Sequence, residues 1–342
     1  MQTILVTGAS GFLGSAIVRM LIDRGDKVHA IYRQKNPKIE KMVSKIFLGD
    51  IGNIDLVKQA AQGCDAVIHT AAKAGMWGKY KDYYHSNVQG TENIVQACLQ
   101  SGIPKLVYTS SPSVAYGIEG TEGGDESLPY PSRYDSFYSA TKAQAERLVL
   151  ASNSSAMATC ALRPHLIWGP EDNHLVPRII AKAKQGRLRI VGNGKNLIDS
   201  IYVDNAAYAH LLALDRLVYG KAPSGKVYFL SQDKPVPAKE LINQILHAAG
   251  ISPIQKHIPA RVAFLAGLFC ETAYSLFSIS AEPPMTRFLA HQLSTPHWFN
   301  IQAAKNDLGY SPIISIEEGL NRLEAWFKAN SVPGNILRTG II

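Results

Sequence analysis

A glycine-rich loop near the start of the chain constrains the fold more than any other feature. The segment TGASGFLG, residues 7–14, follows a short apolar run and opens a helical pattern at Leu13–Arg24. Glycine permits a tight turn at the first position, close backbone approach to a phosphate at the second, and close helix packing at the third. The free N–H groups of the helix N-terminus bind a negative pyrophosphate. The loop therefore predicts dinucleotide contacts at Gly8, Ser10, Gly11, Phe12, Leu13 and Gly14.

Strands and helices alternate over the first 165 residues. Helical patterns such as Gly90–Ser101 separate short apolar runs, which predicts a parallel sheet with helices on both faces. Right-handed crossovers make such a sheet doubly wound, with the ligand crevice at the carboxyl ends of its strands. The predicted strands are Thr3–Thr7, Lys27–Tyr32, Lys45–Leu48, Ala66–His69, Lys105–Thr109, Ala158–Leu162 and, later in the chain, Lys226–Leu230.

The alternation of strands and helices becomes less regular after residue 170, where Pro, Gly and Asn become frequent. The 342 residues are 46% apolar and 18% charged, which excludes a disordered or fibrous chain. The predicted fold class is α/β, a Rossmann-type doubly wound parallel sheet with a smaller, partly interwoven C-terminal substrate-binding region. We expect residues 1–170 to form the dinucleotide-binding domain, with return segments near 200–232. Residues 171–199 and 233–342 are expected to form the substrate-binding region.

The residues after the second predicted strand bear on the choice of dinucleotide. An acidic side chain there binds the ribose 2′-hydroxyl of NAD and repels the 2′-phosphate of NADP. This chain has the run YRQK at residues 32–35, with no carboxylate. Because arginine pairs well with phosphate, Arg33 predicts NADP(H) in preference to NAD(H). Asp50 and Ile51, after the third strand, are expected near the adenine.

A tyrosine and a lysine four residues apart form the candidate proton-transfer group. Tyr138 and Lys142 share one face of a predicted helix, which Asp135 or Ser136 caps. The pKa of free tyrosine is about 10, and a neighbouring ammonium lowers it. The same lysine can hydrogen-bond a cofactor ribose. The TSS run at residues 109–111 is placed to supply a hydroxyl that holds the substrate oxygen.

In this order the motifs resemble those of the extended short-chain dehydrogenase/reductase superfamily. Within it, the runs AKAGMWG (72–78), SPSV (111–114) and IWGPEDNH (167–174) are similar to those of the 3β-hydroxysteroid dehydrogenase-like branch. The resemblance covers nearly the whole chain. The segments that carry it are TGASGFLG (7–14), HTAA (69–72), NVQGTENI (87–94), TSS (109–111), YxxxK (138–142), LRP (162–164) and IYVDNA (201–206).

The resemblance assigns roles to individual residues. Ser111 matches the catalytic serine that positions the substrate oxygen, Tyr138 the acid–base group, and Lys142 the residue that orients the cofactor and tunes the tyrosine pKa. Asn87 lies in a helix typical of the family. A homodimer formed through a helix pair is also implied. Further cofactor contacts implied by the resemblance are Thr70, Ala71, Ala72, Tyr138, Lys142, Pro164 and Leu166.

The resemblance also implies an activity. The expected enzyme is an NAD(P)-dependent oxidoreductase that reduces a ketone, or oxidises a secondary alcohol, on a large apolar substrate. The best match is to reductases of bacterial olefin biosynthesis, which convert a 2-alkyl-3-oxoalkanoate to the 2-alkyl-3-hydroxyalkanoate with NADPH. A 3β-hydroxysteroid or sterol dehydrogenase is one alternative. An NAD-dependent sugar-nucleotide epimerase or dehydratase is another, although Ile198 stands where those enzymes often have arginine. A binding protein without catalysis is a third.

Charge patterning limits the partners. The formal net charge of +8 is spread along the chain without a nucleic-acid type of basic run. One group of cations has roughly helical spacing, which is typical of a solvated helix face or of a surface that meets anionic lipid or a phosphorylated ligand. We expect a cytoplasmic protein that binds an apolar small molecule and no nucleic acid, with peripheral membrane or multienzyme contact kept open. The grouped cations are Arg178, Lys182, Lys184, Arg187 and Arg189.

An apolar segment at Val262–Ile279 has two interpretations. Its uncharged core, Val262–Cys270, has nine residues, whereas a helix that crosses a bilayer needs about 20. Glu271 would be costly in lipid. The preferred interpretation is a buried or lid helix that covers a hydrocarbon-binding cleft. An in-plane membrane contact is the alternative.

Cysteine and histidine spacing points to neither a disulfide scaffold nor a metal site. Widely separated cysteines fit a reduced setting, and the N-terminus runs straight into the first strand rather than into a signal peptide. No histidine pair has ligand spacing with a carboxylate or cysteine, so no metal is expected. The residues concerned are Cys64, Cys98, Cys160, Cys270, His85, His165, His174 and His291.

Overall fold

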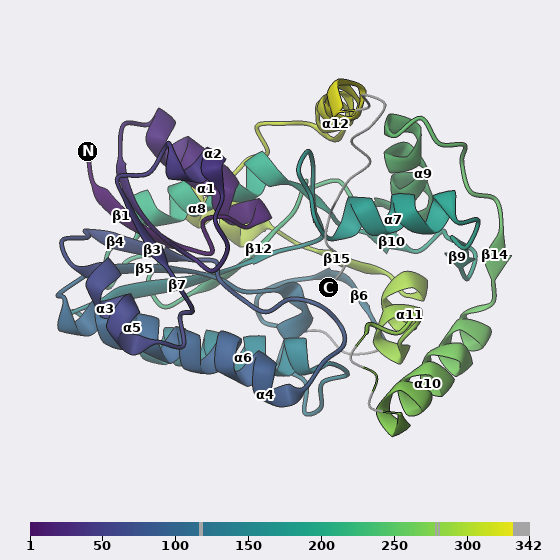
Figure 1. Cartoon of the computed structure of the whole chain (residues 1–342), viewed down its shortest axis with the longest axis horizontal. Coiled ribbons are helices and arrows are strands. Elements are labelled where there is room, and N and C mark those ends of the chain that lie inside the picture. Colours follow the sequence, from purple (N-terminus) through teal and green to yellow (C-terminus); the bar gives the residue numbers. More distant parts are fainter. Residues whose placement is uncertain (116–118, 278, 280, 331–342) are drawn as a thin grey trace.

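The computed structural model describes residues 1–115, 119–277, 279 and 281–330. Its centre is a parallel seven-stranded sheet with the strand order β12-β7-β5-β4-β1-β2-β3 (Figure 1). The order reverses between β1 and β4, which places a crevice at the carboxyl ends of these strands. The strands are β1 (Thr3–Thr7), β2 (Lys27–Tyr32), β3 (Lys45–Leu48), β4 (Ala66–His69), β5 (Lys105–Thr109), β7 (Ala158–Pro164) and β12 (Val227–Leu230).

Helices cover both faces of the sheet. In Figure 1, α1 and α8 lie above it and α3, α5 and α6 below it. The inner strands are apolar without alternation because both of their faces are buried, whereas the edge strand β3 is largely exposed. Along β1, Ile4 and Val6 join one core cluster and Leu5 joins the other. The helices are α1 (Phe12–Asp23), α3 (Ile54–Ala61), α5 (Gly90–Gln100), α6 (Phe137–Ala151) and α8 (Val203–Arg216).

A second, smaller group of elements lies beyond the carboxyl ends of the strands. A four-stranded sheet has the order β13-β10-β15-β6, and β9 pairs with β14, as β8 pairs with β11. Most helices of this smaller group lie at the right of Figure 1. Its elements are β6 (Thr121–Gly124), β8 (Ile167–Trp168), β9 (Ile190–Val191), β10 (Leu197–Ile198), β11 (Ile201–Tyr202), β13 (Val236–Pro237), β14 (His257–Ile258), β15 (His297–Phe299), α7 (Leu175–Lys184), α9 (Ala238–Ala248), α10 (Ala260–Leu276), α11 (Arg287–Ser294) and α12 (Ile316–Asn330).

The two groups of elements are interwoven, and the predicted fold class is confirmed. After the smaller sheet begins, the chain returns to the large sheet through α8, which packs on α1, and through β12, which pairs with β7. In the other direction, β6 leaves the N-terminal part of the chain to pair with β15. The division into residues 1–170 and the rest therefore has an exception at residues 121–124.

The apolar segment at Val262–Cys270 is mostly exposed, whereas the sequence favours a buried or lid helix there. It lies in α10, where only Ala263 and Gly267 are buried. A Cβ on Gly267 would lie 2.6 Å from the backbone carbonyl carbon of Thr286, just before α11. The helix therefore turns its small residues inward, because they allow close packing on α11, and leaves Leu265 and Phe269 exposed. Within the described residues, none of the helices is both long and apolar enough to span a membrane.

Candidate active site

The glycine loop between β1 and α1 has the shape expected of a phosphate cradle. Gly8 has φ +67°, and a Cβ there would lie 2.9 Å from the backbone of Ala71. A Cβ on Gly14 would lie 2.1 Å from the Gly8 carbonyl oxygen. Gly11 is the N-cap of α1, which has no side-chain cap and no acidic residue in its first turn. The N-terminal N–H groups of α1 thus face the crevice without a competing anion, which fits a dinucleotide pyrophosphate.

The other predicted cofactor residues follow the carboxyl ends of neighbouring strands. The Thr70 hydroxyl donates to the Thr7 carbonyl oxygen at 2.7 Å, and the Ala71 N–H donates to the Thr7 hydroxyl at 3.2 Å, so the end of β4 is fixed to the end of β1. Arg33 is largely exposed and lies 3.8 Å from an oxygen of Asp50. The remaining residues lie at the same edge of the sheet, namely Ile51 and Ala72 after β3 and β4, and Pro164 and Leu166 at the end of β7 and just after it.

Two of the three predicted catalytic residues, Ser111 and Tyr138, come together beside this crevice. Ser111 follows β5 and its hydroxyl lies 3.0 Å from that of Ser113. Ser136 is the N-cap of α6 and its hydroxyl accepts from the Ser139 N–H at 3.1 Å, as the sequence predicted for this helix. Tyr138 lies in the first turn of α6 and is hydrogen-bonded to the Ser111 side chain. A substrate oxygen placed here meets two hydroxyl groups, one from β5 and one from α6.

The direction of the Tyr138 pKa differs from the sequence expectation. Burial raises the pKa of Tyr138, and the hydrogen bond with Ser111 opposes that shift. The Lys142 ammonium points elsewhere: it donates to the Thr109 carbonyl oxygen at 2.5 Å and lies 4.2 Å from the centroid of the Tyr108 ring. Burial lowers the pKa of Lys142 to about 7, and Glu146 opposes that shift. Desolvation therefore outweighs the pairing that the sequence predicted.

Asn87 connects the crevice loop to the catalytic helix. Its side chain accepts from the Lys73 N–H at 2.7 Å and donates to the Lys73 carbonyl at 3.2 Å. It also donates to the Thr141 hydroxyl at 3.0 Å. Thr141 directly precedes Lys142, so Asn87 fixes the position of α6 relative to the loop after β4.

A buried ion pair beneath Lys142 was missed in the sequence. Glu146 lies one turn after Lys142 on α6, and Arg163 lies on β7. The Arg163 guanidinium makes two hydrogen bonds to the Glu146 carboxylate, at 2.9 and 2.6 Å, and both side chains are almost fully buried. The Tyr130 hydroxyl donates to the same carboxylate at 2.6 Å. Two features of the sequence indicate such a pair: a charged residue four positions after Lys142, and a second charged residue within an otherwise apolar strand.

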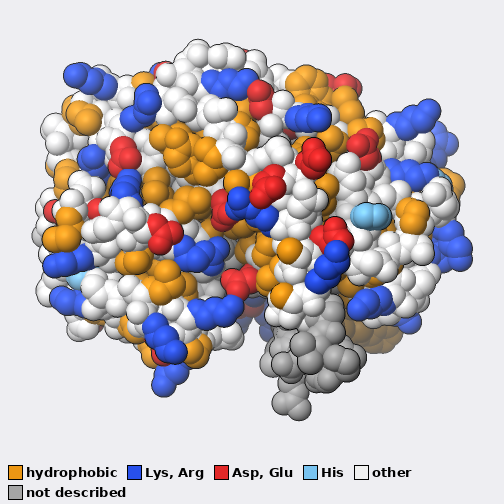
Figure 2. Space-filling view, turned by 90° about the horizontal axis from the view of Figure 1, so that it is seen from above, with side chains coloured by type: hydrophobic (Ala, Val, Ile, Leu, Met, Phe, Trp, Pro, Cys, Tyr) orange, Lys and Arg blue, Asp and Glu red, His pale blue; other side chains and the backbone are white. Residues whose placement is uncertain are grey.

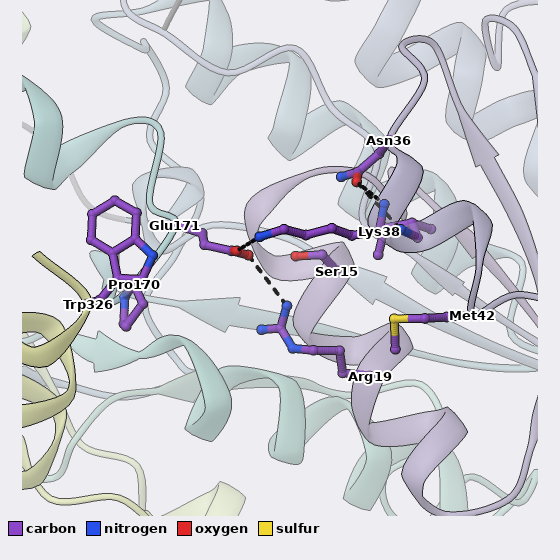
Figure 3. Close-up of a pocket in the computed structure, with 9 residues that line it drawn as sticks. Ser15, Arg19, Asn36, Lys38, Met42, Pro170, Glu171 and Trp326 are labelled. Atoms are coloured by element: carbon purple, nitrogen blue, oxygen red, sulfur yellow. Dashed lines mark hydrogen bonds and ion pairs between the residues drawn. The ribbon is translucent and has the colours of Figure 1, made fainter. Parts of the chain in front are cut away.

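A pocket of about 350 Å³ lies at the edge of the site rather than over the catalytic residues. In Figure 3 the Glu171 carboxylate lies between the side chains of Lys38 and Arg19, at 2.5 and 3.7 Å. These contacts join the segment after β8 to α1 and α2 (Pro37–Glu40). None of the residues that line this pocket is among the predicted cofactor contacts, although Ser15 and Arg19 lie on α1, the helix that follows the glycine loop. The lining residues are Ser15, Arg19, Asn36, Lys38, Ile39, Met42, Pro170, Glu171 and Trp326.

A second buried titratable group, Asp199, lies where the end of β7 meets the smaller sheet. One carboxylate oxygen accepts from the Phe299 N–H at 2.7 Å. Burial raises the pKa of Asp199 to about 7, although hydrogen bonds from Phe299 and Ser231 oppose the shift. Beside it, the His165 ring packs edge-on against His297 with centroids 4.9 Å apart, and burial lowers the pKa of both rings.

The raised pKa of Asp199 predicts a pH-dependent stability. A carboxyl that binds its proton more tightly when folded stabilises the protein below its unfolded pKa and loses that contribution as pH rises to about 7. The free energy of unfolding should therefore fall between about pH 5 and pH 7, by at most about 1.4 kcal/mol per pH unit. Urea unfolding of Asp199→Asn should show a shallower fall, and exposed Asp55→Asn should match wild type. Equal slopes in all three proteins would contradict this prediction.

Within the described residues, no group of three or more His, Cys, Asp or Glu side chains is arranged to hold a metal ion. The described cysteines are free thiols, three of them buried.

Comparison with known proteins gives the family. The model of the 3-beta hydroxysteroid dehydrogenase/isomerase family matches residues 5–259. The chain belongs to this family. It is 49% identical to the 2-alkyl-3-oxoalkanoate reductase of Stenotrophomonas maltophilia, over 94% of this chain and 98% of that one. It is 47% identical to the protein of the same name from Shewanella oneidensis, over 94% and 85% of the two chains.

A solved structure with NAD bound has a similar fold. The structure of MoeE5 in complex with UDP-glucose and NAD is 25% identical to this chain, covers 96% of it and 99% of its own chain, and has a TM-score of 0.73. This member of the 3-beta hydroxysteroid dehydrogenase/isomerase family is therefore an NAD(P)-dependent oxidoreductase of the extended short-chain dehydrogenase/reductase type, acting on hydroxyl or keto groups.

Proposed function

We propose that the chain is an NADPH-dependent reductase that converts a 2-alkyl-3-oxoalkanoate to a 2-alkyl-3-hydroxyalkanoate. The observation that carries the proposal is the juxtaposition of Ser111, Tyr138 and Lys142 beside a phosphate cradle, in a chain nearly half identical to two proteins of that name. Reduction of a ketone requires a hydride on carbon and a proton on oxygen. The bound nicotinamide supplies the hydride.

The side chains of this protein bind the ketone oxygen and supply its proton. The hydroxyls of Ser111 and Tyr138 donate hydrogen bonds to the ketone oxygen, on which negative charge grows during reduction. Tyr138 then gives its proton to that oxygen. Because burial raises the pKa of Tyr138, its hydroxyl stays protonated at neutral pH, which is the form a reductase needs. When the dinucleotide binds, Lys142, whose ammonium donates to the Thr109 carbonyl oxygen, would be the residue that holds the cofactor ribose.

Arg33 supports NADPH as the reductant. It directly follows β2 with an exposed guanidinium, and the run at residues 32–35 contains no carboxylate. Asp50 lies 3.8 Å from it, and this separation is long for a hydrogen-bonded pair. A 2′-phosphate, with its greater charge, competes effectively for this guanidinium.

The proposal is tested by following oxidation of NADPH and NADH with three substrates: a long 2-alkyl-3-oxo acid, a 3-ketosteroid and a UDP-hexose. We expect oxidation of NADPH with the oxo acid. Arg33→Ser should lower kcat/KM for NADPH by about 10- to 100-fold, the value of one charge-assisted phosphate contact, and change that for NADH by less than about threefold. Arg187→Ser, at another exposed arginine, is the control.

The family name makes hydroxysteroid oxidation the second candidate function. Turnover of the ketosteroid alone would replace the proposed substrate and leave the proton-transfer chemistry in place. Turnover of the UDP-hexose without net oxidation of either dinucleotide would overturn the reductase proposal. Equal use of NADH and NADPH by wild type, unaffected by Arg33→Ser, would remove the proposed cofactor preference.

A further inference from the structure

Helix α10 presents a row of large apolar side chains to solvent. Val262, Leu265, Phe269 and Leu276 are 53%, 62%, 74% and 76% exposed, and their spacing of three, four and seven residues places them on one side of the helix. Phe277, directly after the helix, is 72% exposed. A row of this size on a soluble domain marks an interaction surface.

The same side of α10 carries no carboxylate. Glu271 is the acidic residue of the helix, and it is turned toward α11. It accepts hydrogen bonds from the backbone N–H and the guanidinium of Arg287, at 2.7 and 2.6 Å, and is only 17% exposed. The exposed side of α10 therefore consists of apolar side chains, and Arg261 lies in the first turn of the helix.

Basic segments adjoin this helix. The parallel pair β9–β14 places Ile190 and Val191 beside His257 and Ile258, which directly precede α10. In Figure 2, Lys and Arg side chains gather at the right-hand edge, which is the side of the molecule where Figure 1 places β9 and β14. Residues 176–198 and 241–270 contain no Asp or Glu, and their cations are Arg178, Lys182, Lys184, Arg187, Arg189, Lys195, Lys256 and Arg261.

We propose that α10 is the docking element for an anionic membrane surface and lies in the plane of the interface. Its 17 residues span about 25 Å at the helical rise, less than the hydrocarbon core of a bilayer, so the helix lies on the membrane rather than across it. Phe269 and Leu276 enter the acyl boundary, and the neighbouring cations meet acidic headgroups. A symmetric pair of chains joined through this face would instead bring two basic segments together, in which Arg178 is paired with Glu282, and this is unfavourable.

The C-terminal end of α10 also contacts the crevice loop. The Trp77 indole N–H donates to the Ile279 carbonyl at 3.1 Å, and its ring packs edge-on against Tyr274. Trp77 lies in the loop after β4 that Asn87 fixes through Lys73. Docking of α10 therefore places the membrane next to the loop that borders the proposed active site.

Flotation of the full chain with vesicles tests this docking without any substrate. We expect binding to phosphatidylethanolamine–phosphatidylglycerol vesicles and much weaker binding to phosphatidylcholine vesicles. Leu265→Gln/Phe269→Gln should lower the bound fraction about tenfold, because it removes the apolar contact. Leu99→Gln/Ile313→Gln, at two other half-exposed apolar positions, is the matched control and should bind as wild type does. All four positions are exposed, so thermal unfolding should be unchanged.

Reversing two charges tests the contribution of the cations separately from that of the apolar row on α10. Lys184→Glu/Arg187→Glu should weaken binding to the anionic vesicles about tenfold and leave the weak binding to phosphatidylcholine as it is. Absence of flotation for wild type, or equal flotation of wild type and Leu265→Gln/Phe269→Gln, would overturn the proposal. So would a change from dimer to monomer in that variant by light scattering with no loss of flotation, because α10 would then bind a second copy of the chain.

Discussion

Tyr138→Phe is expected to lower kcat for ketone reduction by about 10²- to 10⁴-fold, the contribution typical of a positioned acid. The substitution removes one hydroxyl and keeps the ring, so packing around α6 is preserved. That hydroxyl is the one hydrogen-bonded to Ser111, and burial keeps it protonated by raising its pKa. Binding of NADPH, measured by fluorescence titration, should change by less than about threefold, since the cradle of α1 is untouched.

The matched control is Tyr134→Phe. Tyr134 lies four residues before Tyr138, and its hydroxyl donates to the Val114 carbonyl at 3.2 Å rather than to Ser111. Its loss should leave kcat within about threefold of wild type. Ser111→Ala should lie between the two, because Ser111 positions the oxygen without giving up the proton. A Tyr138→Phe enzyme that keeps a tenth or more of wild-type kcat would assign the proton to another group.

The glycine cradle and the sheet could be predicted from the sequence because both depend on local rules. A loop with Gly8 and Gly14 at fixed spacing after a strand permits few conformations, and the structure shows the close contacts between Gly14 and the Gly8 carbonyl that those glycines permit. Strand and helix alternation then gives a parallel sheet by the handedness of its crossovers. The boundaries differ by one or two residues, as at β7, which continues to Pro164.

The parts that could not be predicted depend on contacts between distant elements. Average hydropathy did not show which side of α10 is buried, because packing on α11 selects the small residues Ala263 and Gly267 over the large ones. The spacing of Tyr138 and Lys142 was read as an ammonium beside a phenol. The Lys142 ammonium is buried and donates to the Thr109 carbonyl oxygen instead. Sequence spacing reveals neither of these facts.

The buried pair beneath Lys142 carries the largest expected effect on stability. Arg163→Met should lower the free energy of unfolding by about 3–5 kcal/mol, because it leaves the Glu146 carboxylate buried without its guanidinium and with the Tyr130 hydroxyl as its hydrogen-bond donor. The exposed pair Arg178–Glu282 has the same 2.6 Å separation, with side chains 44% and 36% exposed. Arg178→Met should cost less than about 1 kcal/mol, since water replaces the lost partner. Urea unfolding measures both, and equal losses would refute the role of burial.

The double variant Arg163→Met/Glu146→Leu separates stability from catalysis. Replacing both charges with apolar groups removes the unpaired carboxylate, so most of the lost stability should return. Activity should not return with it, because Glu146 is the group that raises the pKa of Lys142 against the effect of burial. Without that carboxylate the pKa of Lys142 falls further, so a smaller share of the side chain carries the charge that would hold the cofactor ribose. This predicts a KM for NADPH raised by about tenfold at restored stability. Recovery of both properties would show that the pair serves the fold alone.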